Sequence, residues 1–163
     1  MKLISIMRHA KSSWDYPDLT DEERPLIEKG IKRTEKTCSF IKTKQLIPEV
    51  VYCSPAIRAM ETARLVVKQL NLPSQPVFAE SFYPGISEYY FSHIKKVDPN
   101  LQHIMIVGHN PGVSNFACEL LSNQIAEWIP TSGCVVIQLD IRRWDEIVPG
   151  KGTLRFYIEP KKL

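Results

Sequence analysis

Short apolar runs alternate along this chain with segments whose apolar residues recur every three or four positions. The first run, Leu3–Met7, is almost continuously apolar, which is typical of a strand covered on both faces. Further strands are predicted at 50–52, 77–78, 103–107, 134–141 and 153–158. This alternation predicts an α/β fold, a three-layer α/β/α sandwich with a mostly parallel central sheet.

Helix-period segments lie between these strands. Ile31, Thr34, Cys38 and Ile41 recur at steps of three and four, so a helix is expected from about residue 26 to residue 44. Further helices are expected after residue 55, at 87–97 and after residue 111.

Turn signals divide the later part of the chain. Ser54-Pro55 and Asn110-Pro111 each combine a preferred N-cap residue with proline at the first helical position. Pro149-Gly150 and Gly152 predict a turn that pairs the last two strands as a hairpin at one side of the sheet.

Basic residues and histidines occupy three strand-to-helix junctions. Arg8 and His9 follow the first strand, Arg58 lies in the first turn of the helix after the second strand, and His109 precedes the helix that starts at Asn110-Pro111. In a parallel sheet these junctions share the carboxyl edge, where open α/β folds bind ligands. We therefore expect these four side chains to converge.

This set of side chains suits a phosphoryl group. Arginines donate bidentately to phosphate oxygens, and a helix N-terminus adds backbone N–H groups and a positive dipole. A neutral imidazole is nucleophilic near neutral pH and can attack phosphorus. Phosphoryl transfer mainly requires in-line placement and stabilisation of charge on the equatorial oxygens. The junctions therefore predict a phosphate site with a histidine nucleophile.

Three motifs, in this order, resemble the histidine phosphatase superfamily, also called phosphoglycerate-mutase-like. They are Arg8-His9-Ala10, Ser54-Pro55-x-x-Arg58-Ala59-x-x-Thr62-Ala63 and Gly108-His109-Asn110-Pro111-Gly112. The RHAKSSW stretch, the segment from Arg24-Pro25-Leu26 to Gly30 and the short length are similar to the SixA-type phosphohistidine phosphatase branch. The resemblance implies His9 as nucleophile, Arg8, Arg58 and His109 as a phosphate clamp, and neither metal nor cofactor.

Two positions depart from the pattern of the superfamily. Ala10 stands where most members have glycine, as in SixA-type chains, which argues against a mutase. Glu80, in AESFYPG, stands at about the place of the mutase glutamate that donates a proton; a solvated loop carboxylate is the alternative. A proton donor to an alkoxide leaving group is worth about 10²- to 10⁴-fold, whereas the imidazole of phosphohistidine leaves readily once solvent protonates it.

Other polar residues near the motifs are weaker candidates. Lys11 and Ser12 follow His9 closely enough to touch phosphate, although Lys11 equally suits a helix-surface charge. Asn110 is first a helix cap whose backbone N–H also suits an anion. His93 and His103 lie outside any motif, so structural or solvated roles are expected.

Composition narrows the class of partner. The 163 residues suit one domain spanning 1–163, and the net charge of +3 without a basic run disfavours nucleic acid. The four cysteines form no zinc or redox motif. The first apolar run is too short for a signal peptide, and no stretch approaches the roughly 20 apolar residues of a membrane span. A cytoplasmic protein with no membrane partner is expected.

Three functions fit these observations. The favoured one is a phosphatase that acts through phospho-His9 on protein phosphohistidine. The second is a phosphatase of small phosphorylated metabolites. The third is a phosphate-binding module without turnover, against which the two histidines argue because binding alone needs only the arginines.

Overall fold

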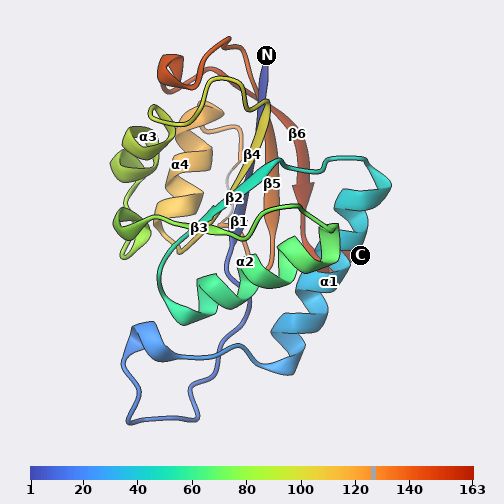
Figure 1. Cartoon of the computed structure of the whole chain (residues 1–163), viewed down its shortest axis with the longest axis vertical. Helices are drawn as coiled ribbons and strands as arrows, with labels where there is room; N and C mark the ends of the chain where they lie inside the picture. The colour runs from blue at the N-terminus through green and yellow to red at the C-terminus, as the bar shows by residue number, and fades with distance from the viewer. Residues whose placement is uncertain (126–127) are drawn as a thin grey trace.

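The computed structural model describes residues 1–125 and 128–163. Within these residues six strands form one sheet in the order β3-β2-β4-β1-β5-β6 (Figure 1). The strands are β1 (Lys2–Arg8), β2 (Val50–Cys53), β3 (Val77–Phe78), β4 (His103–Gly108), β5 (Cys134–Leu139) and β6 (Gly152–Ile158). β3, β2, β4 and β1 are parallel, while β5 pairs antiparallel with both β1 and β6. The mostly parallel sheet and the terminal hairpin are as predicted.

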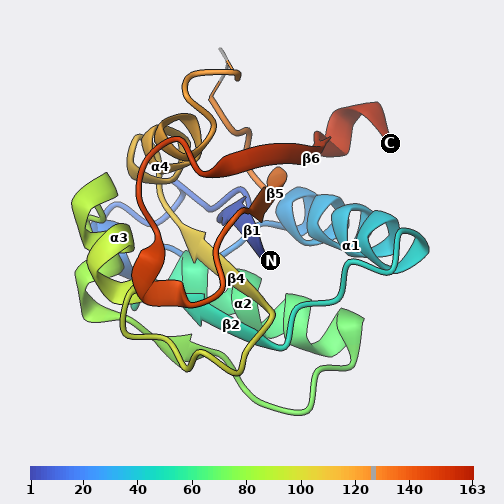
Figure 2. The same cartoon turned by 90° about the horizontal axis from the view of Figure 1, so that it is seen from above.

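Two pairs of helices cover the sheet, one pair on each face (Figure 2). α1 (Glu28–Thr43) and α2 (Ile57–Leu70) lie on one side, and α3 (Ser87–Ile94) and α4 (Gly112–Leu120) lie on the other. The three-layer prediction is therefore confirmed.

The alternation of side chains along each strand supplies two separate cores. In β1, Ile4 and Ile6 pack with α3 and α4, whereas Met7 packs with α1 and α2. Every residue of β4 is buried, as expected of a strand covered on both faces. Burying a side chain of this size stabilises the fold by about 1.5–3 kcal/mol, so the two cores hold the sheet edge in place.

Two details of the helices differ from the sequence-based expectations. α1 buries Thr34, Cys38 and Ile41, but Ile31 is 37% exposed because it borders the groove between α1 and α2. The third helix ends at Ile94 instead of residue 97. Periodicity identified both helices, and packing determined their buried positions and their ends.

Among the described residues no helix combines the length and the apolar character needed to cross a membrane. In the same residues, no group of three or more His, Cys, Asp or Glu side chains could hold a metal ion.

Candidate active site

The register of β1 and β4 brings two histidines side by side. These strands are neighbours, and Arg8 is paired with Gly108. The next residues, His9 and His109, therefore leave the sheet together, and the His9 N–H donates to the Gly108 carbonyl at 3.0 Å. Their ring centroids are 5.0 Å apart. The juxtaposition follows from the parallel pairing of two buried strands.

A pocket of about 520 Å³ opens at this carboxyl edge. Its lining comes from the ends of β1 and β4, from the loop between β1 and α1, from α1 and α2, from the loop before β5, and from the C-terminal segment. The lining residues are Arg8, His9, Lys11, Ser12, Trp14, Arg24, Arg33, Arg58, His109, Asn110, Pro130, Thr131, Pro160 and Lys161. The four junction residues and the weaker candidates Lys11, Ser12 and Asn110 thus meet in one place.

Two hydrogen bonds define the tautomer of His9. The Ala10 carbonyl can only accept, so Nδ1, which lies 2.8 Å from it, carries the proton. The Arg58 Nε–H can only donate, so His9 Nε2, 3.3 Å away, carries the lone pair. Both contacts require the same neutral imidazole, with its unprotonated nitrogen facing the guanidinium.

Burial and positive charge keep both pocket histidines neutral. Burial, together with the charges of Arg58, Arg8 and Arg24, lowers the pKa of His9 to about 3, against the hydrogen bond to Ala10. The pKa of His109 is also lowered to about 3, mainly by burial and then by neighbouring positive groups. Neither ring is therefore protonated at neutral pH.

Acidification is expected to destabilise the protein through these rings. Because their pKa is lower in the folded state, the unfolded chain binds more protons below pH 6.5, so stability falls as pH falls through this window. Between pH 7 and pH 5 the free energy of unfolding, measured with urea in phosphate-free buffer, should fall by about 2 kcal/mol for each ring.

A His9→Gln variant is the matched control, because it should lose about 2 kcal/mol less than the parent protein over the same pH range. The imidazole NMR signal of His9 should not titrate above pH 5. A midpoint near 6.5 would contradict the buried neutral ring.

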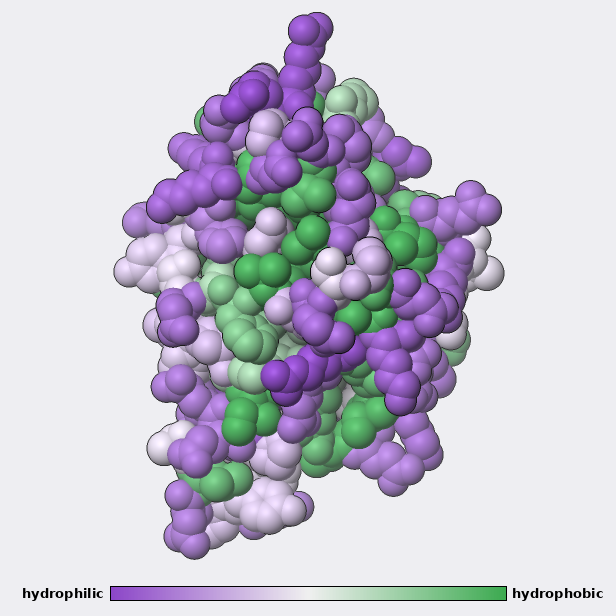
Figure 3. Space-filling model, viewed as in Figure 1, coloured by the Kyte–Doolittle hydropathy of each residue, from purple (hydrophilic) through white to green (hydrophobic). Residues whose placement is uncertain are grey.

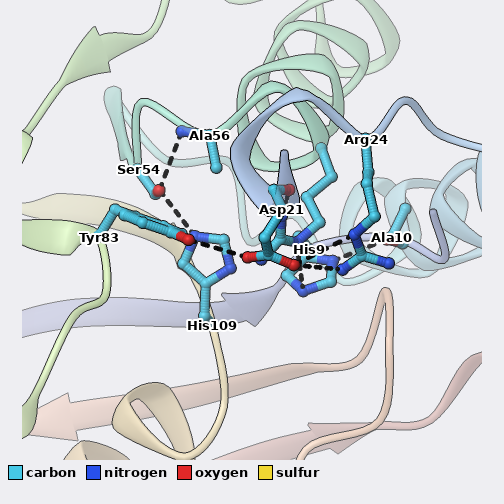
Figure 4. Close-up of polar contacts among 9 residues, drawn as sticks. His9, Ala10, Asp21, Arg24, Ser54, Ala56, Tyr83 and His109 are labelled. Atoms are coloured by element: carbon cyan, nitrogen blue, oxygen red, sulfur yellow. Dashed lines mark hydrogen bonds and ion pairs between the residues drawn. The ribbon is translucent and has the colours of Figure 1, made fainter. Parts of the chain in front are cut away.

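Asp21 joins the site from the 3₁₀ helix η1 (Asp21–Glu23), which sequence reasoning did not single out. Its carboxylate accepts from Arg58 Nη2 at 2.8 Å, from the Tyr83 hydroxyl at 2.9 Å and from Arg24 Nε at 3.2 Å (Figure 4). Burial opposes its ionisation, but the hydrogen bonds from Arg58 and Tyr83 outweigh burial and hold the pKa of Asp21 below its ordinary value. Asp21 is therefore a carboxylate that orients arginines.

Ser54 has a role different from the predicted N-cap. α2 begins at Ile57 with Ala56 as its N-cap residue. The Ser54 hydroxyl lies 2.7 Å from His109 Nε2 and accepts the Ala56 N–H at 3.2 Å. Ser54 thus ties the end of β2 to the imidazole that follows β4 (Figure 4).

Asn110 also differs from the predicted cap. α4 has Pro111 as its N-cap residue and no side-chain cap bond. The Asn110 amide donates to the Ile129 carbonyl at 2.9 Å and accepts the Ser114 hydroxyl at 2.5 Å. It therefore fastens the loop that carries Pro130 and Thr131 to the pocket.

The carboxyl group of Glu80 does not line the pocket. Glu80 begins a short 3₁₀ helix, Glu80–Phe82, and is exposed. The His103 ring lies outside the pocket and bonds Ser5 Oγ at 2.8 Å, a structural role.

Small residues allow the catalytic loops to approach their neighbours. A side chain at Gly108 would collide with the Tyr90 hydroxyl, and one at Gly30 would collide with the Lys11 backbone. The Thr62 hydroxyl accepts the Ala10 N–H at 2.9 Å and donates to the Arg58 carbonyl at 2.6 Å. These contacts join the loop after β1 to α1 and α2.

Fold and pocket together define a class of α/β enzymes that bind a phosphoryl group among arginines and histidines at the carboxyl edge of the sheet. The sequence profile of the histidine phosphatase superfamily (branch 1) matches residues 4–83. An uncharacterised protein of Mycobacterium tuberculosis is 30% identical over 165 residues, covering 95% of this chain and 100% of the relative. The chain belongs to the histidine phosphatase superfamily, and it is a hydrolase of the phosphatase class.

SixA proteins are among the similar sequences and structures. Phosphohistidine phosphatase SixA of Escherichia coli is 25% identical over 164 residues, covering 98% of this chain and 95% of the relative. The crystal structure of the putative phosphohistidine phosphatase SixA from Agrobacterium tumefaciens superposes with a TM-score of 0.82 at 24% identity, with 98% of each chain covered. The superposition establishes the phosphoglycerate-mutase-like fold.

Proposed function

We propose that this protein is a phosphohistidine phosphatase that removes a phosphoryl group from histidine on a protein. His9 Nε2 attacks phosphorus, the N–P bond of the substrate breaks, and the departing imidazole takes a proton from solvent. Water then attacks phospho-His9, releasing phosphate and restoring the ring. No metal or cofactor takes part in these steps.

The state of His9 supports the nucleophilic role. Its Nε2 lone pair faces the pocket side occupied by Arg58, and its Nδ1–H is anchored on the backbone. A nucleophile must be unprotonated and held in line with the reacting atom. The lowered pKa of His9 meets the first requirement, and the hydrogen bonds to Ala10 and Arg58 hold the ring in one orientation, as the second requires.

Two orphaned polar atoms indicate where an anion would bind. Arg8 Nε and His109 Nδ1 are buried and have no hydrogen-bond partner among the described residues. Buried polar groups are nearly always hydrogen-bonded, so a missing partner requires an explanation. Phosphoryl oxygens in the pocket would accept a hydrogen bond from Arg8 Nε and form another with His109 Nδ1. Arg8, His109 and Arg58 would then form a phosphate clamp.

The choice of substrate depends on whether a side chain near the pocket can donate a proton to the leaving group. The pocket lining contains no carboxyl side chain among the described residues, and Glu80 lies outside it. The nearby carboxyl of Asp21 is held ionised by Arg58 and Tyr83, so it has no proton to donate at neutral pH. An alkyl ester needs such a donor, whereas phosphohistidine does not. The similarity to SixA of Escherichia coli supports the same assignment.

One observation favours the runner-up, a phosphatase of small phosphorylated metabolites. A pocket of about 520 Å³ lies within the range of small-molecule sites, roughly 300–1,000 Å³. Such a substrate would place its organic part against Trp14 or Thr131, which line the pocket.

A comparison of leaving groups tests the proposal. The ratio kcat/KM should be at least about 10²-fold higher for a phosphohistidine protein than for sugar, glycerol or nucleoside phosphates, because the alkoxide of these esters leaves unassisted. p-Nitrophenyl phosphate should be cleaved faster than the alkyl esters, since nitrophenolate needs no proton. A higher kcat/KM for any alkyl ester would overturn the assignment. Absence of turnover and of an acid-labile label on His9 would leave a binding module.

A further inference from the structure

Four basic side chains from three segments lie at the mouth of the pocket or beside it on α1, and they are here called the basic rim. Lys11 follows the nucleophile, Lys29 and Arg33 lie one turn apart on α1, and Lys161 lies in the C-terminal segment. Lys11, Arg33 and Lys161 line the pocket. Lys29 is exposed, and α1 approaches the segment after β1 so closely that a side chain at the neighbouring Gly30 would collide with the Lys11 backbone. The charges of Arg33 and Lys11 lower the pKa of Lys29, in keeping with this proximity.

The basic rim has no acidic counterpart in the part of the chain that the structure describes. No ion pair within 4.0 Å involves any of its four members. The acids nearest in sequence to Lys29 and Lys161 are paired elsewhere, Glu28 with Lys32 at 3.2 Å and Glu159 with Lys162 at 2.8 Å. Like charges four residues apart on a helix, such as Lys29 and Arg33, destabilise it. An anion bound beside Lys29 and Arg33 would relieve this repulsion.

The extent of the basic rim exceeds what a phosphoryl group can cover. Arg8, Arg24 and Arg58 already serve the pocket, and Lys29 lies outside its lining. A ligand that contacts Lys29 must therefore extend from the pocket over α1, where hydrophilic side chains predominate on the face shown in Figure 3. The C-terminal segment lies beside the same helix (Figure 1).

The pocket lining also includes an exposed aromatic ring. Trp14 lines the pocket with 78% of its surface exposed, and the Arg24 guanidinium stacks 3.6 Å from its ring centroid. Tryptophan is among the residue types that dominate the binding energy of protein interfaces. A macromolecular substrate would contact both the basic rim and this ring.

We propose that the basic rim docks an acidic protein surface that carries the phosphorylated histidine, so that the carboxylates around that histidine pair with Lys29, Arg33 and Lys161 while its phosphoryl group enters the pocket. This inference rests on the proposed function and adds the character of the partner. Complementary charge steers association and selects partners, mainly through the association rate and in a salt-dependent way.

Lys29→Glu tests the docking surface without altering the pocket. Lys29 is exposed, lies outside the pocket lining and occupies the first turn of α1, where a negative charge suits the helix dipole. The probe is an isolated histidine-phosphotransfer domain with an acidic surface, phosphorylated on histidine. We expect kcat/KM on this domain, and its affinity measured on a His9→Ala background, to fall about five- to tenfold at low salt. Hydrolysis of p-nitrophenyl phosphate should stay unchanged.

Lys151→Glu is the matched control. It makes the same change of charge at an exposed position just before β6, at the opposite end of the sheet. Unlike Lys29→Glu, it should leave binding of the domain unchanged.

The possible outcomes separate this inference from the proposed function. Parental binding of the domain by Lys29→Glu, or an equal loss in Lys151→Glu, overturns the docking surface. A loss of p-nitrophenyl phosphate hydrolysis in Lys29→Glu would assign the rim to small substrates. If Lys29→Glu bound single-stranded RNA more weakly but bound the domain as the parent protein does, the basic rim would be a nucleic-acid site. Either this result or the loss of p-nitrophenyl phosphate hydrolysis would overturn the inference. Failure of the parent protein to dephosphorylate a domain that it still binds through Lys29 would overturn only the proposed function.

Discussion

A His9→Ala variant is expected to release phosphate from p-nitrophenyl phosphate at least about 10⁴-fold more slowly than the parent protein. The substitution removes the only Nε2 lone pair that is held against Arg58, so no phosphoenzyme forms. Phosphate affinity, measured by calorimetry, should stay within about tenfold because Arg8, Arg58 and His109 remain. We therefore expect His9→Ala to lower kcat and to leave phosphate binding almost unchanged.

Two controls make this result specific to the nucleophile. The parent protein, quenched during turnover, should carry an acid-labile phosphoryl label that the variant lacks. His93→Gln changes an imidazole on α3 that packs against Tyr52 and Phe82 and lies outside the pocket, so it should retain activity. Residual kcat within tenfold of the parent value in His9→Ala would show that another group attacks phosphorus.

The second large effect is expected from Arg58→Ala, which should lower kcat/KM about 10²- to 10³-fold and weaken phosphate binding in parallel. The guanidinium of Arg58 is buried beside His9 and supplies permanent positive charge where we propose that the transferring phosphoryl group lies. Its loss also leaves the carboxylate of Asp21 without its 2.8 Å partner, so this negative charge would repel phosphate.

The double variant Arg58→Ala/Asp21→Asn separates the two causes. Removing the carboxylate should restore part of the phosphate affinity while kcat stays low. Arg64→Ala, an exposed arginine on the same helix, is the matched control and should behave as the parent protein. Parental phosphate affinity in Arg58→Ala would contradict a clamp that includes this residue.

The elements of this fold were predictable because each depends on local pattern. Leu3–Met7 reads as a covered strand, and the observed β1 spans Lys2–Arg8. One further rule, that parallel strands present their carboxyl ends at one edge, was enough to predict that the residues at the strand-to-helix junctions converge. These residues are Arg8, His9, Arg58 and His109.

Other members of the site were not predictable from local pattern. Asp21 sits in a polar loop that reads as solvated, yet η1 folds back so that its carboxylate meets Arg58, 37 positions later. The sequence assigned Ser54 to a helix cap, but its hydroxyl bonds His109, 55 positions away. Short polar side chains satisfy local and distant partners equally well, so their partners depend on which segments meet.

The sequence by itself determined the order of strands and helices along the chain, the edge of the sheet at which the pocket opens and the four side chains suited to phosphate. The reason is that hydrophobic periodicity and strand-end chemistry are local properties of the chain. Only the tertiary structure decided the tautomer of His9 and the ionised state of Asp21. It also decided that Lys11, Arg33 and Lys161 line the same pocket. Those properties arise from distances, burial and fields between segments that are remote along the chain, and they exist only once the helices pack against the sheet.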